Sequence, residues 1–129
     1  MDNELFELCK EVYEKTRWQI ENPSFFGVQY YGSPFETELM VTTDQAASFQ
    51  APLYTSDYLL EKLPRNIGSY GLEMWSYPSD DGVAFGYYDT LAKRWHQTIP
   101  QRGDRLPLKA LLKLTIALHE AGELKGNSL

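Results

Sequence analysis

Three extended runs in the middle of the chain constrain its fold more than any other feature. Residues 70–77, 83–88 and 91–99 are rich in aromatic and β-branched side chains, and turn-forming residues at 78–82 and 89–90 separate them. Strands joined by such short connections pair antiparallel with their neighbours in sequence. The runs therefore predict a three-stranded antiparallel meander.

Period-two alternation assigns the two faces of this meander. The face expected to turn toward the core carries Tyr70, Leu72, Met74, Val83, Phe85 and Tyr87. Trp75 and Tyr77 fall on the other face of the first run, and Trp95 lies among charged neighbours in the third. Both faces of the meander therefore carry aromatic residues.

Aromatic residues on two faces allow two interpretations. Either helices cover both faces and the aromatic side chains are structural, or one face is open and serves as a contact surface, where Tyr, Trp and Arg are enriched. Three helices are expected in the chain, which favours coverage of both faces.

The first helix is expected at the N-terminus, over residues 1–22. Asp2 or Asn3 can cap it, and apolar residues recur behind them at intervals of three and four. Pro23 disfavours helical geometry at the preceding residue, so the helix is expected to end near Glu21.

Two more helices follow from capping residues and prolines. Thr55 or Ser56 begins a second helix, which Pro64 stops. A third begins at Pro107, where a first-turn proline loses no helical hydrogen bond, and ends at Gly122. Lys109 and Lys113 mark its solvent side. The tail over 123–129 is expected to fray.

Two further extended runs, 25–31 and 36–43, flank a Gly-Ser-Pro connection at 32–34 and predict two strands, although the second run fits a short extended loop equally well. The element order is then α-β-β-α-β-β-β-α. This order predicts an α+β fold with an antiparallel meander packed against helices, or an α-β-α sandwich.

Size and charge restrict the domain count and the partners. A chain of 129 residues with 43% hydrophobic residues fits one domain over 1–129. The net charge is −6, and residues 1–60 hold 10 acidic residues against 3 basic ones. An acidic surface repels phosphate backbones, so nucleic acid is an unlikely partner.

One cysteine, Cys9, rules out an intramolecular disulfide and a cysteine-based zinc site, and it is expected to be a small core residue. The chain opens without a basic segment followed by an apolar stretch, and it has no apolar run of about 20 residues. We therefore expect a cytoplasmic protein with no membrane partner.

Reactive groups are sparse. The two histidines, His96 and His119, stand in no catalytic or metal-binding motif, and neither a nucleophile elbow nor a glycine-rich phosphate loop is present. The carboxylates of Asp80 and Asp81 are expected to serve a hairpin turn. The sequence therefore predicts a protein that is not an enzyme, with no catalytic residue, cofactor or metal.

The most distinctive feature is the density of aromatic residues around the meander. Residues proposed to form a binding surface are Tyr54, Tyr58, Trp75, Tyr77, Tyr88, Arg94, Trp95 and His96. The first hypothesis is a non-catalytic accessory domain that uses this surface to bind a protein partner or to form a homo-oligomer.

A second hypothesis is an enzyme that acts on a small molecule. Its pocket would be lined by part of the same set: Tyr54, Tyr58, Trp75, Trp95 and His96. This hypothesis requires His96 to approach a carboxylate, either Asp57 or Asp89.

Charged residues suggest two further functions. Basic residues near Tyr88 and Trp95 form the one candidate nucleic-acid surface, and solvated charges explain them as well: Lys93, Arg94, Arg102, Arg105, Lys109 and Lys113. The first helix carries a row of acidic residues that fits an inhibitor of a host nucleic-acid enzyme or an ordinary solvated face: Glu4, Glu7, Glu11 and Glu14.

Three segments together resemble a known family. They are a Tyr-Thr-Ser-Asp helix start at 54–57, a strand containing Trp75, and a helix that opens Leu-Pro-Leu-Lys-Ala at 106–110. Over roughly residues 50–122 the chain resembles the small phage-encoded proteins of the phage α-β-α sandwich family, which begin that helix with Tyr-Ser-Thr-Asp. The resemblance implies a phage or prophage origin and a three-layer fold, and it implies no activity.

Overall fold

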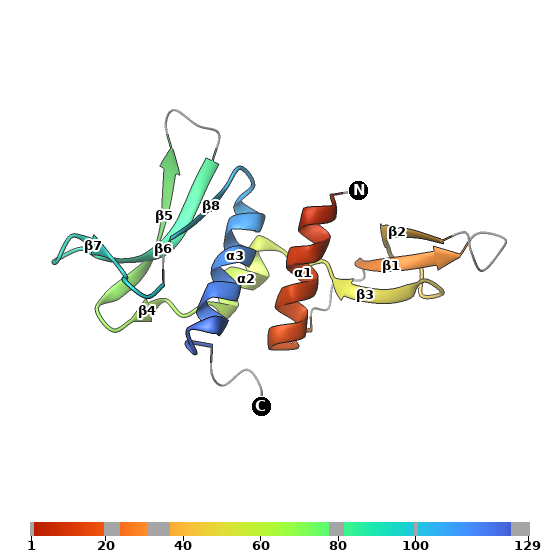
Figure 1. Cartoon of the computed structure of the whole chain (residues 1–129), viewed down its shortest axis with the longest axis horizontal. Helices are drawn as coiled ribbons and strands as arrows, with labels where there is room; N and C mark the ends of the chain where they lie inside the picture. The colour runs from red at the N-terminus through yellow and green to blue at the C-terminus, as the bar shows by residue number, and fades with distance from the viewer. Residues whose placement is uncertain (1, 20–23, 31–36, 78–81, 100, 125–129) are drawn as a thin grey trace. The chain divides into compact units, whose positions relative to one another are not determined.

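The computed structural model describes residues 2–19, 24–30, 37–77, 82–99 and 101–124. The chain divides into two compact units, Met1–Tyr54 (unit 1) and Thr55–Leu129 (unit 2). The described residues form helices and two antiparallel sheets, which confirms the α+β class (Figure 1). The single domain and the α-β-α sandwich stay predictions.

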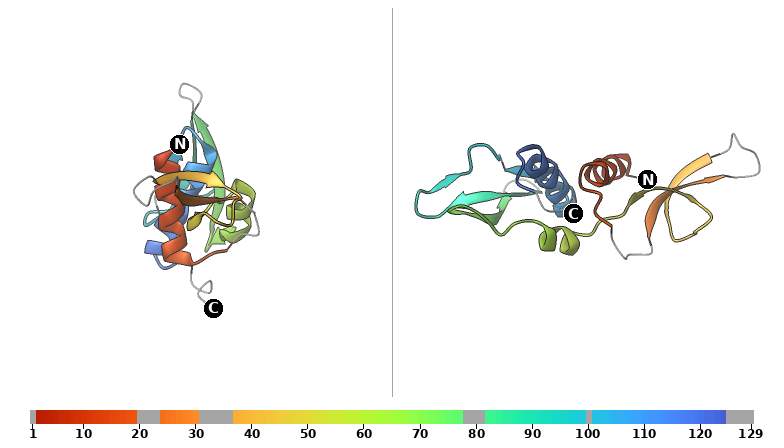
Figure 2. Two further views of the ribbon diagram at one scale, coloured as in Figure 1. Left: turned by 90° about the vertical axis from the view of Figure 1, so that its right-hand side faces the viewer. Right: turned by 90° about the horizontal axis from the view of Figure 1, so that it is seen from below.

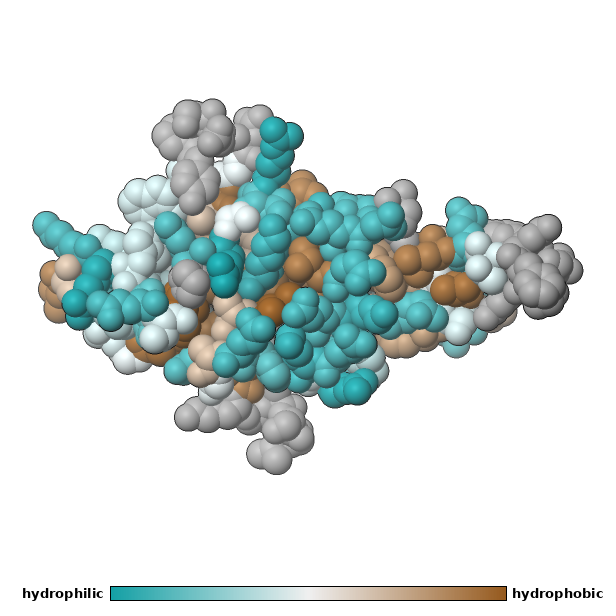
Figure 3. Space-filling model, viewed as in Figure 1, coloured by the Kyte–Doolittle hydropathy of each residue, from teal (hydrophilic) through white to brown (hydrophobic). Residues whose placement is uncertain are grey.

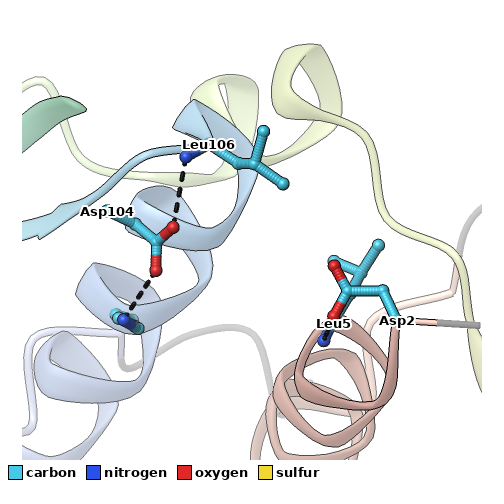
Figure 4. A network of polar contacts seen from close by, with 5 residues as sticks. Asp2, Leu5, Asp104 and Leu106 are labelled. Atoms are coloured by element: carbon cyan, nitrogen blue, oxygen red, sulfur yellow. Dashed lines mark hydrogen bonds and ion pairs between the residues drawn. The ribbon is translucent and has the colours of Figure 1, made fainter. Parts of the chain in front are cut away.

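The first helix of unit 1 begins where the sequence predicts and ends early. Helix α1 spans Asn3–Thr16, and the Asp2 carboxylate caps it by accepting a hydrogen bond of 3.0 Å from the Leu5 N–H (Figure 4). The expected end near Glu21 is wrong, because Arg17 adopts a left-handed conformation (φ 58°). This turn carries Trp18 into the interior, where it is 4% exposed.

Unit 1 contains a three-stranded antiparallel sheet. Strand β1 (Phe25–Tyr30) lies between β2 (Thr37–Thr42) and β3 (Ser48–Pro52). The run at 36–43 is therefore a strand and not an extended loop. Strand β3 was not predicted, because its Ser-Phe-Gln-Ala-Pro sequence has a weak intrinsic preference for a strand and forms one by pairing with β1. The connection at 32–34 lies outside the described residues.

The core of unit 1 lies between α1 and the sheet. Phe6 of α1 packs edge-to-face on Phe26 of β1, with 5.3 Å between the ring centroids. Cys9 and Val12, on the same side of α1, have no exposed surface. The outer side of α1 is hydrophilic (Figure 3).

Unit 2 begins with α2 (Ser56–Lys62), whose predicted boundaries are confirmed. Thr55 caps α2, and Leu63 ends it immediately before Pro64. The strands that follow are β4 (Asn66–Ile67), β5 (Tyr70–Tyr77), β6 (Gly82–Asp89), β7 (Arg94–Trp95) and β8 (Arg102–Asp104).

The predicted meander is present with a shorter last strand. The strands run in the order β4-β5-β6-β7, all antiparallel, and β8 also pairs with β6. Only two residues of the run at 91–99 are strand, because Asp89 organises a longer turn than predicted. Its carboxylate accepts hydrogen bonds from the N–H groups of Leu91 and Ala92, and Lys93 is left-handed (φ 55°). The proposed turn pair, Asp80 and Asp81, lies outside the described residues.

Helix α3 (Pro107–Glu120) packs against β6 and β8, and α2 lies beside it (Figures 1 and 2). Phe85 and Tyr87, predicted to face the core, are 6% and 0% exposed. The Tyr87 hydroxyl donates a hydrogen bond of 2.7 Å to the Pro64 carbonyl. Met74 was predicted on the same core face but is 56% exposed, so the core does not extend along the whole of β5.

One prediction for α3 and the segment after it is wrong. Lys113, predicted on the solvent side of α3, is half-exposed, and its Nζ lies 2.8 Å from an Asp104 carboxylate oxygen. Gly122 has a φ of 77° and ends the helix as predicted. Leu124 is buried, which contradicts fraying from residue 123; residues 125–129 lie outside the described part.

Candidate functional site: an aromatic cluster on the sheet of unit 2

Three of the proposed surface residues come together on unit 2, one from each of three adjacent strands. Trp95 of β7 lies between Trp75 of β5 and Tyr88 of β6, with ring centroids 6.0 and 5.1 Å away. The interplanar angles are 75° and 67°. These edge-to-face contacts are a preferred aromatic geometry, so the three rings form a pre-organised group. We call these residues the aromatic cluster.

Strand register places the cluster on one face of the sheet. Trp75 is opposite Ala84 and Tyr88 is opposite Trp95, and residues directly opposite each other point to the same side. Small residues of β6 lie beneath the rings. A Cβ added at Gly86 would lie 3.0 Å from the Trp95 ring, so the ring sits directly on the backbone of β6.

The face that carries the cluster is open at Trp75 and covered at Gly86, where a Cβ would lie 2.9 Å from the Gln101 Cβ. Trp75 is 54% exposed, and Tyr88 and Trp95 are half-buried. The favoured expectation that helices cover both faces of the meander is therefore wrong at Trp75. An exposed tryptophan held in a fixed orientation suits recognition, because it presents a large apolar area at low entropic cost.

Arg94 and His96 do not join the cluster. Arg94 is opposite Asp89 in the register, on the other side of the sheet from Trp95. The His96 ring packs 4.7 Å from the Tyr70 ring, and its Nδ1 accepts hydrogen bonds of 3.2 Å from the N–H groups of Thr98 and Ile99. His96 therefore orders the loop after β7.

Asp89, one of the two carboxylates that the enzyme hypothesis offered as a partner for His96, is engaged elsewhere. Asp89 accepts hydrogen bonds from the N–H of Ala92, the Ser69 hydroxyl and the N–H of Leu91. These bonds, with the nearby charge of Arg94, lower the pKa of Asp89 although burial opposes them. Within the described part of the chain, no carboxylate contacts His96, so the acid-base pair is not assembled.

The remaining proposed surface residues have other environments. Tyr54 is 1% exposed, and its hydroxyl donates a hydrogen bond of 2.7 Å to the Trp18 carbonyl, so it belongs to the core of unit 1. Tyr58 lies half-buried on α2, where burial raises its pKa and the Lys62 ammonium lies 5.5 Å from its ring. Tyr77 ends β5, and its side chain is not described.

Neither charged surface matches its proposed function closely. Of the basic residues, Lys113 pairs with Asp104 and Arg94 faces away from Trp95, so these two do not interleave with the aromatic cluster. In the acidic row of α1, Glu11 lies 3.8 Å from Lys15. Basic side chains therefore interrupt the row.

The described residues contain few groups suited to catalysis or metal binding. Among residues with a described position, no three His, Cys, Asp or Glu side chains gather where they could hold a metal ion. Burial raises the pKa of the Cys9 thiol to about 11, and Cys9 is a core residue as predicted. Over the described residues, the helices are too short or too polar to cross a membrane.

Sequence reasoning missed an open hollow of about 370 Å³ in unit 1. Two carboxylates and five apolar residues line it: Asp2, Leu5, Phe26, Glu38, Leu39, Met40 and Val41. It also missed Ala84 and Gly86 as supports of the cluster. The signal was in the sequence, since small residues alternate with aromatic ones along β6.

The chain was compared with models of protein families, with curated proteins and with solved structures, and it matches none of them. The resemblance to the phage α-β-α sandwich family therefore stays a prediction.

Proposed function

We propose that this chain is a non-catalytic, cytoplasmic protein-binding domain that uses the aromatic cluster of unit 2 to contact another protein chain. The observation that carries the proposal is Trp75, which is 54% exposed and held edge-to-face against Trp95. An exposed, oriented tryptophan flanked by a second tryptophan and a tyrosine has the composition of an interface centre.

Three facts support binding over catalysis. The cluster is apolar and contains no titratable base, His96 orders a loop, and the Asp89 carboxylate serves a turn. The phage or prophage accessory function implied by the resemblance is compatible with such a domain. A cytoplasmic location is consistent with the one cysteine being a buried thiol.

The test compares two neighbouring residues of β5. Trp75→Ala removes the most exposed ring of the cluster, and Met74→Ala removes a side chain of similar exposure on the opposite face of the same strand. Wild-type, Trp75→Ala and Met74→Ala chains are immobilised and exposed to a host extract, and retained proteins are quantified.

We expect proteins that bind the wild-type and Met74→Ala chains and that bind Trp75→Ala at least about tenfold less, as for an interface hot spot. Equal retention on all three chains would contradict the proposal. So would a wild-type chain that retains nothing and stays monomeric in sedimentation velocity.

A further inference from the structure

In the described part of the chain, strand β5 has one paired edge and one edge that is open over most of its length. Strand β6 pairs with all of β5 from Gly71 to Tyr77. On the other edge, β4 reaches only Tyr70 and Gly71. Among the described residues, nothing pairs with this edge over residues 73–77. An unpaired strand edge is a template for another strand.

The direction of the backbone groups on this edge follows from one hydrogen bond. The Leu72 N–H donates to the Arg65 carbonyl at 2.9 Å, so the backbone of Leu72 points away from β6. Backbone groups alternate in direction along a strand, so Met74 and Ser76 also point outward. Within the described part of the chain, neither has a backbone partner on that side.

The segment lacks the features that usually protect an exposed edge. Residues 73–76 are all exposed, and the strand contains no proline, no lysine and no bulge in its pairing with β6. Its only charge is Glu73. As far as the structure describes the chain, this edge is therefore open to pairing.

We propose that β5 pairs antiparallel, along this open edge, with β5 of a second copy of this chain. The two-fold axis passes beside Trp75, so that Met74 faces Ser76 of the second copy. This register uses every outward-pointing backbone group between residues 73 and 77, giving four hydrogen bonds across the two-fold axis. This pairing rests on the proposed function for the role of Trp75, and it identifies the bound protein as a second copy of the chain.

The side chains are compatible with this register. Trp75 falls opposite Trp75 of the second copy in a pair without backbone hydrogen bonds, where side chains lie closest and aromatic pairs are favourable. Glu73 falls opposite Tyr77 of the second copy, so the two Glu73 carboxylates are not opposite each other and do not repel at close range. The aromatic clusters of two chains thereby form one continuous aromatic row.

A second copy is a better occupant than an unrelated extended peptide. Pairing two copies satisfies two open edges at once, whereas a bound peptide satisfies one and brings an unpaired edge of its own. The isologous two-fold contact is also the commonest symmetry of protein dimers.

The test removes the outward N–H at one position and leaves the rest of the strand intact. Ser76→Pro deletes that N–H and places a ring on the open edge, a position where edge strands tolerate proline. Ser76→Ala keeps the N–H and serves as the matched control. Self-association of the full chain is measured by sedimentation equilibrium from about 10 μM to about 1 mM, the range suited to a weak contact.

We expect a wild-type dimer, an unchanged Ser76→Ala dimer, and a dissociation constant for Ser76→Pro raised about thirtyfold by the loss of two of the four hydrogen bonds. Circular dichroism checks that Ser76→Pro is folded. A wild-type chain that stays monomeric throughout, or a Ser76→Pro chain that is folded and dimerises normally, would overturn the proposal.

A measurement on the unmodified chain decides the case if Ser76→Pro does not fold. Amide hydrogen exchange of Met74 and Ser76, followed by NMR, should slow as the concentration rises, while that of Leu72, which already donates to Arg65, should change little. Fast, concentration-independent exchange at both amides overturns the pairing.

Trp75→Ala separates failure of this pairing from failure of the proposed function. If the chain is monomeric but Trp75→Ala still loses a bound protein, the edge pairing is wrong and the aromatic cluster remains a binding surface. If edge pairing occurs and Trp75→Ala weakens neither the dimer nor any other contact, the proposed role of the cluster is wrong.

Discussion

The two units use tryptophan in opposite ways. In unit 1, Trp18 is 4% exposed, and its carbonyl accepts a hydrogen bond from the buried Tyr54 hydroxyl. In unit 2, Trp75 is 54% exposed and supported by a second tryptophan on the same sheet face. The difference shows that the aromatic richness of this chain has two causes, a packed interior in unit 1 and an open, ordered surface in unit 2.

The cores of the units also differ. Unit 2 buries a run of leucines from one face of α3 against β6 and β8, whereas unit 1 relies on the Phe6–Phe26 contact and small residues of α1. Core substitutions should therefore act on one unit more than on the other if the units are energetically separate.

The largest expected effect comes from Leu111→Ala, which should lower the free energy of unfolding of unit 2 by about 2 to 5 kcal/mol, because Leu111 has no exposed surface. Urea unfolding is followed by fluorotryptophan NMR, in which Trp18 reports on unit 1 and Trp75 on unit 2. The Trp75 transition should move to lower urea while the Trp18 transition stays in place. An equal shift of both would support the single domain that the sequence predicts.

The next effect compares two buried tyrosine hydroxyls in matching roles. Tyr87→Phe and Tyr54→Phe each remove a hydrogen bond of 2.7 Å to a backbone carbonyl, at Pro64 in unit 2 and at Trp18 in unit 1. Each should lower the free energy of unfolding by about 1 to 2 kcal/mol, with the larger loss at Tyr54, because its hydrogen bond is buried and that of Tyr87 is part-buried. Tyr87→Phe should shift the Trp75 transition and Tyr54→Phe the Trp18 transition. The reverse pattern would contradict the division into units.

A smaller effect is expected from acid. Burial alone would raise the pKa of Asp104, but the hydrogen bond from Lys113, the Leu106 N–H and the charges of Lys113 and Lys109 together lower it. A carboxyl group whose pKa is lowered in the folded state stabilises the fold at pH values above its unfolded-state pKa of about 3.8. This stabilisation is lost as the pH falls through the folded-state pKa. The free energy of unfolding of unit 2 should therefore fall by up to about 1 kcal/mol between about pH 5 and about pH 2. The effect is kept small because solvent screens the partly exposed Lys113.

Asp104→Asn is the control for the acid effect. It should lower the stability of unit 2 at pH 7 and should reduce the further loss on acidification, measured by urea unfolding at each pH. An Asp104→Asn chain with the full wild-type acid sensitivity would place the effect on another carboxylate, with Asp89 as the first alternative because its pKa is also lowered.

The smallest effect concerns reactivity at neutral pH. Cys9 has no exposed surface and a pKa raised to about 11, so its thiol should react with Ellman's reagent only as unit 1 opens. Val12→Ala, which loosens the same face of α1, should speed the reaction several-fold, whereas Leu111→Ala should not. Rapid labelling of the native wild-type chain would contradict the buried position of Cys9.

Local signals predicted the parts of the fold that local chemistry determines. Asp2 and Thr55 cap helices, Pro64 and Pro107 mark an end and a start, and alternation placed Phe85 and Tyr87 in the core. Strands β3, β4 and β8 were not predicted, because each is short and forms by pairing with a longer strand.

The candidate site was predicted in part. Alternation correctly placed Trp75 away from Leu72. The same alternation puts Arg94 and Trp95 on opposite sides of β7, so the prediction that grouped Arg94 with Trp95 on one surface was wrong. Tyr54 was predicted on the surface, but its hydroxyl donates a buried hydrogen bond to the Trp18 carbonyl. That bond was not predictable, because the two residues are 36 positions apart in sequence. Contacts over such separations leave no local pattern.

The measurement that tests the central claim most directly is ¹⁹F NMR of the chain labelled with 5-fluorotryptophan, whose three tryptophans report on both units. As the chain is concentrated or a captured partner is added, the resonances of Trp75 and Trp95 should shift or broaden while that of Trp18 stays fixed. A Trp18 resonance that responds while Trp75 and Trp95 do not would contradict a binding surface on the sheet of unit 2.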